Sequence, residues 1–187
     1  MQADTEEPVE IDPWKAEVQQ RRQRALARGD IVSFLVKLGI TVLAGWILFG
    51  WVFGLAVMEG ESMYPRIRDG DLMVCYRIQK EYHIGDVVTF RRDGKRYTGR
   101  VVALGGDTVD LGESGELLVN GNIQSEEIFY PTQPAEDGIP FPFRVPPGSV
   151  FLLCDFRTNG TDSRVYGAVD TKELDGKVIT ILRRRGI

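Results

Sequence analysis

The residues with the clearest chemical potential lie in residues 58–70, MEGESMYPRIRDG, and Ser62 is at their centre. Ser62 follows Gly60 by two residues and precedes a Met, so we expect it on an irregular segment where backbone N–H groups can point at a ligand. A serine placed there can act as a nucleophile whose oxyanion is stabilised by those N–H groups. Most loop serines bond only their own backbone, so the surrounding sequence has to decide between these interpretations.

The composition excludes some classes of partner. The chain has 187 residues and a net charge of −4, which indicates a globular domain with a further segment and argues against a nucleic-acid partner. The spacing of Asp107, Asp155 and Asp162 is not a metal signature. No metal and no other cofactor is therefore predicted.

An uncharged stretch of 20 residues, residues 38–57, predicts a transmembrane helix, because it would span about 30 Å of hydrocarbon. Gly50 and Gly54 within it form a small-xxx-small pair that could contact another helix, although glycines are also simply tolerated in lipid. The basic segment before it, residues 14–28, predicts a separate helix that ends at Gly29. We expect that helix to lie beside the lipid bilayer.

The basic residues all precede the span, and the positive-inside rule therefore places the N-terminus in the cytoplasm. The expected protein is a single-pass plasma membrane protein whose main domain is extracytoplasmic. Its expected parts are a cytoplasmic tail and juxtamembrane helix (1–30), a transmembrane helix (31–57) and a β domain (58–187). Residues 1–13 are polar and acidic, which predicts a disordered tail.

Beyond Met58 the pattern is that of β-strands. Asp93-Gly94 predicts a two-residue hairpin turn, which would place Gly99 opposite Val88. Asn120-Gly121 predicts a second hairpin, and apolar runs at 150–154 and 177–182 predict further strands. The proline-rich residues 130–147 predict a long loop that packs on the sheet. The fold class is therefore mainly β, anchored by one N-terminal transmembrane helix.

Taken together, these motifs resemble the type I signal peptidase family, the membrane-anchored serine proteases that cut signal peptides from exported proteins. The resemblance covers essentially the whole chain after Arg28, and Gly60 is more typical of the Gram-positive branch. The matching segments are GESMYP (60–65), GDVVTF (85–90), RVVALGGDTV (100–109), LLVNG (117–121), VPPGSVFLL (145–153) and DSRVYG (162–167).

The resemblance implies a Ser/Lys dyad on a coiled antiparallel β-sheet, with Ser62 at the nucleophile position. A lysine can take the serine's proton only when burial lowers its pKa and keeps it neutral. Family substrates bind as an added β-strand beside the segments that match residues 85–90 and the strand leading to Gly99, so signal peptides in extended form are the implied partners. The implied substrate contacts are Gly60, Met63, Asp86, Val87, Val88 and Thr98.

This chain departs from the family at the base. The lysine should immediately precede the residue that matches Arg100, and Gly99 stands there instead. The family's serine that hydrogen-bonds the lysine is Gly160, and larger residues, Cys154 and Phe156, replace a Gly and an Asn. These changes indicate a dismantled base site in which larger neighbours fill the lysine's space. A structural role is expected for the retained Arg100, Asp107, Asp155, Asp162 and Arg164.

Other bases and other functions stay open at this point. Lys95 lies about 13 Å from Gly99 along the strand, and His83 is not in the lysine's place. The alternatives are a signal peptidase with an unorthodox base, a non-catalytic relative, and a structural module. The non-catalytic relative would bind signal peptides or pilin precursors, resembling factors of Gram-positive pilus assembly, and the missing amine favours it. Cys75 and Cys154 are equally compatible with a disulfide and with two thiols.

Overall fold

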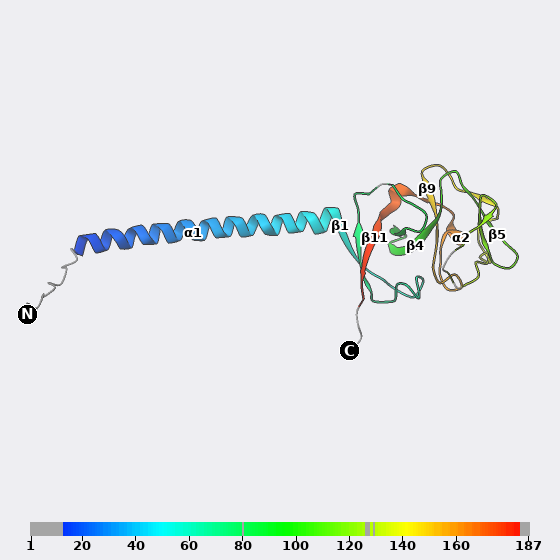
Figure 1. Ribbon diagram of the computed structural model, residues 1–187, viewed down its shortest axis with the longest axis horizontal. Helices are drawn as coiled ribbons and strands as arrows, with labels where there is room; N and C mark the ends of the chain where they lie inside the picture. The colour runs from blue at the N-terminus through cyan, green and yellow to red at the C-terminus, as the bar shows by residue number, and fades with distance from the viewer. Residues whose placement is uncertain (1–12, 80, 126–127, 129, 184–187) are drawn as a thin grey trace, which may run out of the picture. The chain divides into compact units, whose positions relative to one another are not determined.

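One long helix, α1 (Pro13–Ile47), forms the first of two compact units, which divide after Trp46. The computed structural model describes residues 13–79, 81–125, 128 and 130–183. The disordered tail was predicted for residues 1–13, and residues 1–12 of it lie outside the described residues. The predicted helix stop at Gly29 was wrong, because α1 continues through it without a break (Figure 1). An isolated glycine costs a helix only about 1 kcal/mol.

Residues Gly29–Val52 are long and apolar enough to cross a membrane, with a mean hydropathy of 2.2. The helical part of this stretch ends sooner than predicted, because a π-helical turn, η1 (Leu48–Val52), is followed by strand β1 (Phe53–Val57). The prediction of a helix to Val57 was therefore wrong. The residues of β1 are alternately buried and exposed, which is the period of a strand and not of a lipid-facing helix.

The predicted glycine pair does not share a helix face. Gly50 is in η1, whereas Gly54 is a buried residue of β1. The side chain of Arg77 lies over Gly54 and donates a hydrogen bond from Nη1 to the Gly50 carbonyl oxygen, at 2.8 Å. The prediction of a helix–helix contact through these two glycines is corrected accordingly.

Unit 2 is built on two antiparallel sheets, so the mainly β fold class is confirmed. The larger sheet has seven strands in the order β1, β2 (Leu72–Tyr76), β11 (Leu174–Leu182), β3 (Val87–Arg92), β4 (Lys95–Leu104), β9 (Ser149–Leu153), β10 (Val169–Asp170). The smaller has four, in the order β7 (Asn122–Ile123), β6 (Leu117–Val119), β5 (Thr108–Leu111), β8 (Phe143–Arg144). Unit 2 also contains two short helices, α2 (Ser163–Tyr166) and the 3₁₀ turn η2 (Thr171–Glu173).

Both predicted hairpins are present. Asp93 and Gly94 have φ of 51° and 75°, which is the left-handed conformation that a two-residue β-turn of this type requires. The register between β3 and β4 places Gly99 opposite Val88, as predicted. Asn120 and Gly121 have φ of 54° and 77° between β6 and β7.

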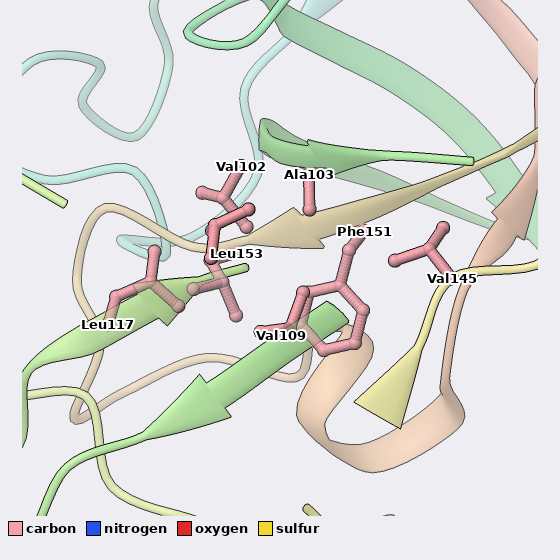
Figure 2. Close-up of a cluster of buried hydrophobic side chains, with 8 residues drawn as sticks. Val102, Ala103, Val109, Leu117, Val145, Phe151 and Leu153 are labelled. Carbon is pink, nitrogen blue, oxygen red and sulfur yellow. The ribbon is translucent and has the colours of Figure 1, made fainter. Parts of the chain in front are cut away.

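The two sheets share a hydrophobic core. Figure 2 shows Phe151 and Leu153 of β9 together with Val109 of β5 and Leu117 of β6, all of them buried. The proline-rich loop packs against the same cluster, because the Phe143 ring lies 5.6 Å from the Phe151 ring. A second cluster contains Met58, Met63 and Met73, and a third lies on β3, β4 and β9.

Candidate functional site

Ser62 lies in a cleft of about 410 Å³ within unit 2. One wall is the chain that leaves the end of β1, and the other is the first half of β4. Thr161, from the loop before α2, completes the lining. The lining residues are Val57, Met58, Glu59, Ser62, Lys95, Arg96, Tyr97, Thr98 and Thr161.

The serine is held by its neighbours on both sides. Met63 is fully buried in the second core cluster, which anchors the segment directly after Ser62. Gly60 has a φ of 79° and donates its N–H to the Asp69 carboxylate at 2.7 Å, which shapes the turn before Ser62. The Ser62 carbonyl oxygen accepts a hydrogen bond from the Phe156 N–H at 2.9 Å. Ser62 itself is half-buried, so its position is defined while its side chain stays at the cleft.

Gly160 and Cys154, which are far from Ser62 in the sequence, lie beside it in the structure. A β-carbon built on Gly160 would lie 3.4 Å from Cβ of Ser62 and 2.6 Å from Sγ of Cys154. The φ of Gly160 is outside the left-handed region, so the backbone would accept an L side chain there. The Cys154 thiol, rather than the backbone, is therefore what excludes a side chain at position 160.

Gly99 is buried in β4 on the same face of the sheet as Val88 and Leu152. A β-carbon at Gly99 would lie 3.1 Å from Cβ of Leu152, so a side chain there would require Leu152 to move by a few tenths of an ångström. Cys154 follows Leu152 by two residues, which is the spacing of successive side chains on one face of a strand.

The Cys154 thiol is protonated at neutral pH. Burial, and to a smaller extent the nearby Asp162 carboxylate, raise its pKa to about 12 against the opposing effects of the Ser62 hydrogen bond and of Arg164 and Arg157. A thiol with such a pKa is neither a nucleophile nor a base. Cys75 is also a buried free thiol, so the two cysteines do not form a disulfide.

Comparison with known proteins identifies the family. The model of the family described as signal peptidase, peptidase S26, matches residues 31–182. A signal peptidase I from Bacillus caldolyticus is 33% identical over 156 residues, which cover 74% of this chain and 83% of that protein. The chain belongs to the signal peptidase family. Its N-terminal apolar helix fits a membrane-anchored member of that family.

Two further matches are relevant. A protein of Staphylococcus aureus strain Mu50 named inactive signal peptidase IA is 24% identical, covering 79% of this chain and 89% of its own length. A crystal structure of a signal peptidase I from Enterococcus faecalis V583 is 26% identical with a TM-score of 0.45, and covers 54% of this chain and 97% of that chain.

Of the two segments expected to pair with a substrate strand, only one has a free edge in this member of the signal peptidase family. β3 is paired along both edges, with β11 at Val88 and with β4 at Val87 and Val88, so it has no free edge for a peptide. Val88 is fully buried, and Asp86 is engaged by Lys177 Nζ at 2.7 Å. The prediction of an added strand beside residues 85–90 is therefore wrong for β3, whereas the other predicted position, beside the strand that leads to Gly99, has a free edge. Thr98, by contrast, does line the cleft.

The free edges lie elsewhere. In the described part of the chain, β4 pairs with β9 only from Arg100 onward, which leaves residues 95–99 unpaired on the edge away from β3. Among the described residues, β1 pairs with β2 alone and is an end strand of the sheet. The cleft is lined by residues of both strands. The contribution of β1 to the cleft, through Val57, was missed from the sequence because residues 53–57 were assigned to the membrane helix.

The residues predicted to be structural form buried ion pairs and turns. Arg100 binds Asp155 through two hydrogen bonds of 2.7 and 2.6 Å, and the Asp155 side chain is fully buried. Arg164 binds Asp162 in the same two-pronged way, at 2.9 and 2.8 Å. Asp162 also accepts the Cys154 N–H at 3.0 Å, so this pair orients the residue beside Ser62. Asp107 caps its turn by accepting the Leu104 N–H at 2.8 Å.

Other ionisable residues are distributed as follows. His83 is exposed, with its Nδ1 at 4.0 Å from the Asp86 carboxylate, and Lys172 is exposed on η2. Lys95 lines the cleft together with Ser62. Among the described residues, no group of three or more His, Cys, Asp or Glu side chains has the geometry of a metal site.

Two features near Ser62 were not predicted. Arg157 is buried and donates to the Cys154 carbonyl oxygen and to Thr132 Oγ1, both at 2.7 Å, which ties the Cys154 segment to the proline-rich loop. The Phe156 ring lies 6.1 Å from that of Tyr64 and 4.6 Å from that of Tyr130. Phe156 was visible in the sequence as a departure from the family motif, but its aromatic neighbours come from distant segments.

Proposed function

We propose that this signal peptidase family member binds signal-peptide-like extended segments in the Ser62 cleft and cleaves them poorly or not at all. The proposal includes a cytoplasmic N-terminus and an extracytoplasmic main domain, because a cluster of basic residues at 15–28 precedes the apolar span whereas Glu59 and Glu61 are the first charged residues after it. The single observation that carries it is the packing of Cys154 against Gly160 and Ser62, since a protonated thiol occupies the side of Ser62 where a base is needed.

A serine hydroxyl attacks a peptide bond at a useful rate only when a base accepts its proton. Position 99 has no side chain, and Cys154 holds its own proton at neutral pH. Both the family's amine and the hydroxyl that would orient it are absent, because Gly99 and Gly160 stand at those positions. The Ser62 hydroxyl is then a polar group in a binding cleft and not an activated nucleophile.

Peptide binding is supported by the two unpaired strand edges beside the cleft. Residues 95–99 of β4 offer main-chain N–H and C=O groups that an extended peptide can pair with, as in other cases of strand addition. The ladder from Lys95 to Thr98 is about 10 Å long at roughly 3.4 Å per residue, which accommodates about four peptide residues. Pilin precursors are one class of such segments, and a role in pilus assembly is included in the proposal on that basis.

A relative of this chain in S. aureus is named inactive signal peptidase IA, which supports a family member without ordinary cleavage activity. The second candidate function is a working signal peptidase in which Lys95 is the base. One observation favours it, because Lys95 and Ser62 line the same cleft. Lys95 is exposed there, whereas a lysine base has to be desolvated to be neutral at physiological pH, so we rank this function second.

The deciding experiment follows binding and cleavage in the same sample. The full-length protein in detergent is mixed with a fluorescent precursor peptide, and anisotropy reports binding while mass spectrometry reports product. We expect saturable binding without product, and equal binding by Ser62→Ala. Cleavage at an ordinary rate that is lost in Ser62→Ala would refute the proposal, and its additional loss in Lys95→Met would establish the second candidate.

Restoring the base tests the same idea in the opposite direction. Gly99→Lys combined with Gly160→Ser and Cys154→Gly returns the amine and its hydroxyl partner, and removes the thiol that would clash with the new serine. We expect this triple variant to gain cleavage at the site where the wild-type protein only binds. A folded triple variant that binds the peptide without cleaving it would show that the missing groups are not the reason for inactivity.

A further inference from the structure

Two cations line one end of the Ser62 cleft although the whole chain has a net charge of −4. The tip of the β3–β4 hairpin carries four cationic residues, and two of them, Lys95 and Arg96, line the cleft. Three carboxylates lie on the hairpin, paired with it or in the same cleft, and one of them, Glu59, lines the cleft. Asp93 is in the turn, and Asp175 is shared by Arg91 and Arg96, at 3.4 and 3.9 Å. The four cationic residues are Arg91, Arg92, Lys95 and Arg96.

The Arg96 guanidinium has hydrogen-bonding capacity to spare. Its Nε is buried and has no hydrogen-bond acceptor among the described residues, since the nearest paired carboxylate oxygen, from Asp175, is beyond hydrogen-bond distance. A buried donor without an acceptor costs free energy, because it has lost its hydrogen bond to water without replacement. An incoming carboxylate or carbonyl that drew the guanidinium toward the cleft would recover part of that free energy.

The strand geometry places a cation on each face of an added peptide. Successive side chains of β4 point to opposite faces, so Lys95 shares a face with Tyr97 while Arg96 shares the other with Thr98. A peptide paired with the free edge of β4 would have side chains on both faces as well. An acidic side chain at the hairpin end of that peptide would therefore lie beside a cation whichever face it occupies.

We propose that Lys95 and Arg96 select extended peptides with an Asp or Glu about three residues from the peptide residue that lies beside Thr98. This inference rests on the proposed peptide-binding function and deepens it by naming the chemical class of ligand. The ligand is a polypeptide rather than an anionic lipid, because both cations lie in the same cleft as Ser62 and beside an unpaired strand edge.

The test uses the full-length protein in a zwitterionic detergent and a fluorescent peptide of about ten alanine, valine and serine residues, a length that exceeds the free edge. Asp is placed at each position in turn, and the isosteric Asn peptide is the reference at each position. We expect Asp to bind about five- to tenfold more tightly than Asn at one or two neighbouring positions and equally elsewhere. The preference should decrease with added salt.

Charge reversal assigns the effect to this end of the cleft. Lys95→Glu should remove the preference for Asp and should favour a peptide with Lys at the same position. Lys172→Glu is the matched control, because Lys172 is an exposed lysine on η2 that does not line the cleft, and it should bind as the wild type does. Arg96→Gln, which keeps a donor but no charge, should weaken the preference in part.

The outcomes separate this inference from the proposed function. Peptides that bind without any difference between Asp and Asn would overturn the inference and leave strand binding intact. No binding of any peptide would overturn both. If Lys95→Glu changed only the binding of phosphatidylglycerol vesicles, and no peptide preference was seen, the basic tip would be a lipid contact and the inference would be wrong.

Discussion

Cys154 and Gly160 should depend on each other for stability, and a double-mutant cycle can measure this. In Gly160→Ala the new methyl group would lie 2.6 Å from Sγ and 2.9 Å from Cβ of Cys154. Cys154 is 2% exposed and its N–H is bonded to Asp162, so it has little room to move away. We expect Gly160→Ala to destabilise the protein by about 1–3 kcal/mol through overpacking.

Removing the thiol should relieve that strain. Cys154→Gly alone should cost about 2–3 kcal/mol, because it deletes a buried CH₂ and sulfur and adds backbone freedom in a strand end. With glycine at position 154 the methyl group of Gly160→Ala no longer meets a side chain there. The double variant should therefore be about as stable as Cys154→Gly, which corresponds to a favourable coupling energy of about 1–3 kcal/mol.

The assay is urea unfolding of the full-length protein in detergent, followed by the circular dichroism of the β-sheets, because the three tryptophans of the chain all lie in α1 and η1. The matched control combines Gly160→Ala with Cys75→Gly, because Cys75 is the other buried free cysteine and packs in the cluster of Met58, Met63 and Met73. That pair should be additive within about 0.5 kcal/mol. Additive effects for Gly160→Ala and Cys154→Gly as well would contradict the inference that the thiol excludes a side chain at position 160.

Three further predictions follow from the site. The pKa of Cys154 is raised from an ordinary 9.0 to about 12, so its stabilising contribution is complete below pH 9 and is lost as the pH rises toward 12. At about pH 10.5 the wild type should have lost roughly 2 kcal/mol more than Cys154→Ala relative to neutral pH, as measured by urea unfolding, and parallel pH curves would count against a shifted thiol. A thiol reagent at pH 8 should label the native protein only after unfolding, because about one Cys154 in 10⁴ would be ionised, and rapid labelling of Cys154 would argue against its burial. Arg100→Met should destabilise the protein by about 3–5 kcal/mol, because it leaves the buried Asp155 carboxylate without this partner. Arg92→Met on the exposed hairpin tip should change the unfolding free energy by less than about 1 kcal/mol. Similar losses in both variants would refute this difference.

Features decided by local chemistry could be predicted from the sequence. The Asp93-Gly94 turn needs two residues with positive φ, and these two residues tolerate it, so the hairpin and the pairing of Gly99 with Val88 followed from sequence alone. The absence of an amine at position 99 is likewise a fact of sequence. So is the apolar stretch before Ser62, because its length and lack of charge are local properties.

Features decided by distant contacts could not be predicted in the same way. The helix stops at Ile47 and strand β1 begins at Phe53 because β2, which follows later in the chain, pairs with that segment. Whether β3 or β4 has a free edge depends on where β11 docks, and β11 is the last strand of the chain. The sequence determined which chemical groups Ser62 lacks. Only the tertiary structure decided that the Cys154 thiol packs beside it and that the cleft opens between β1 and β4, since both depend on pairings between segments far apart in the chain.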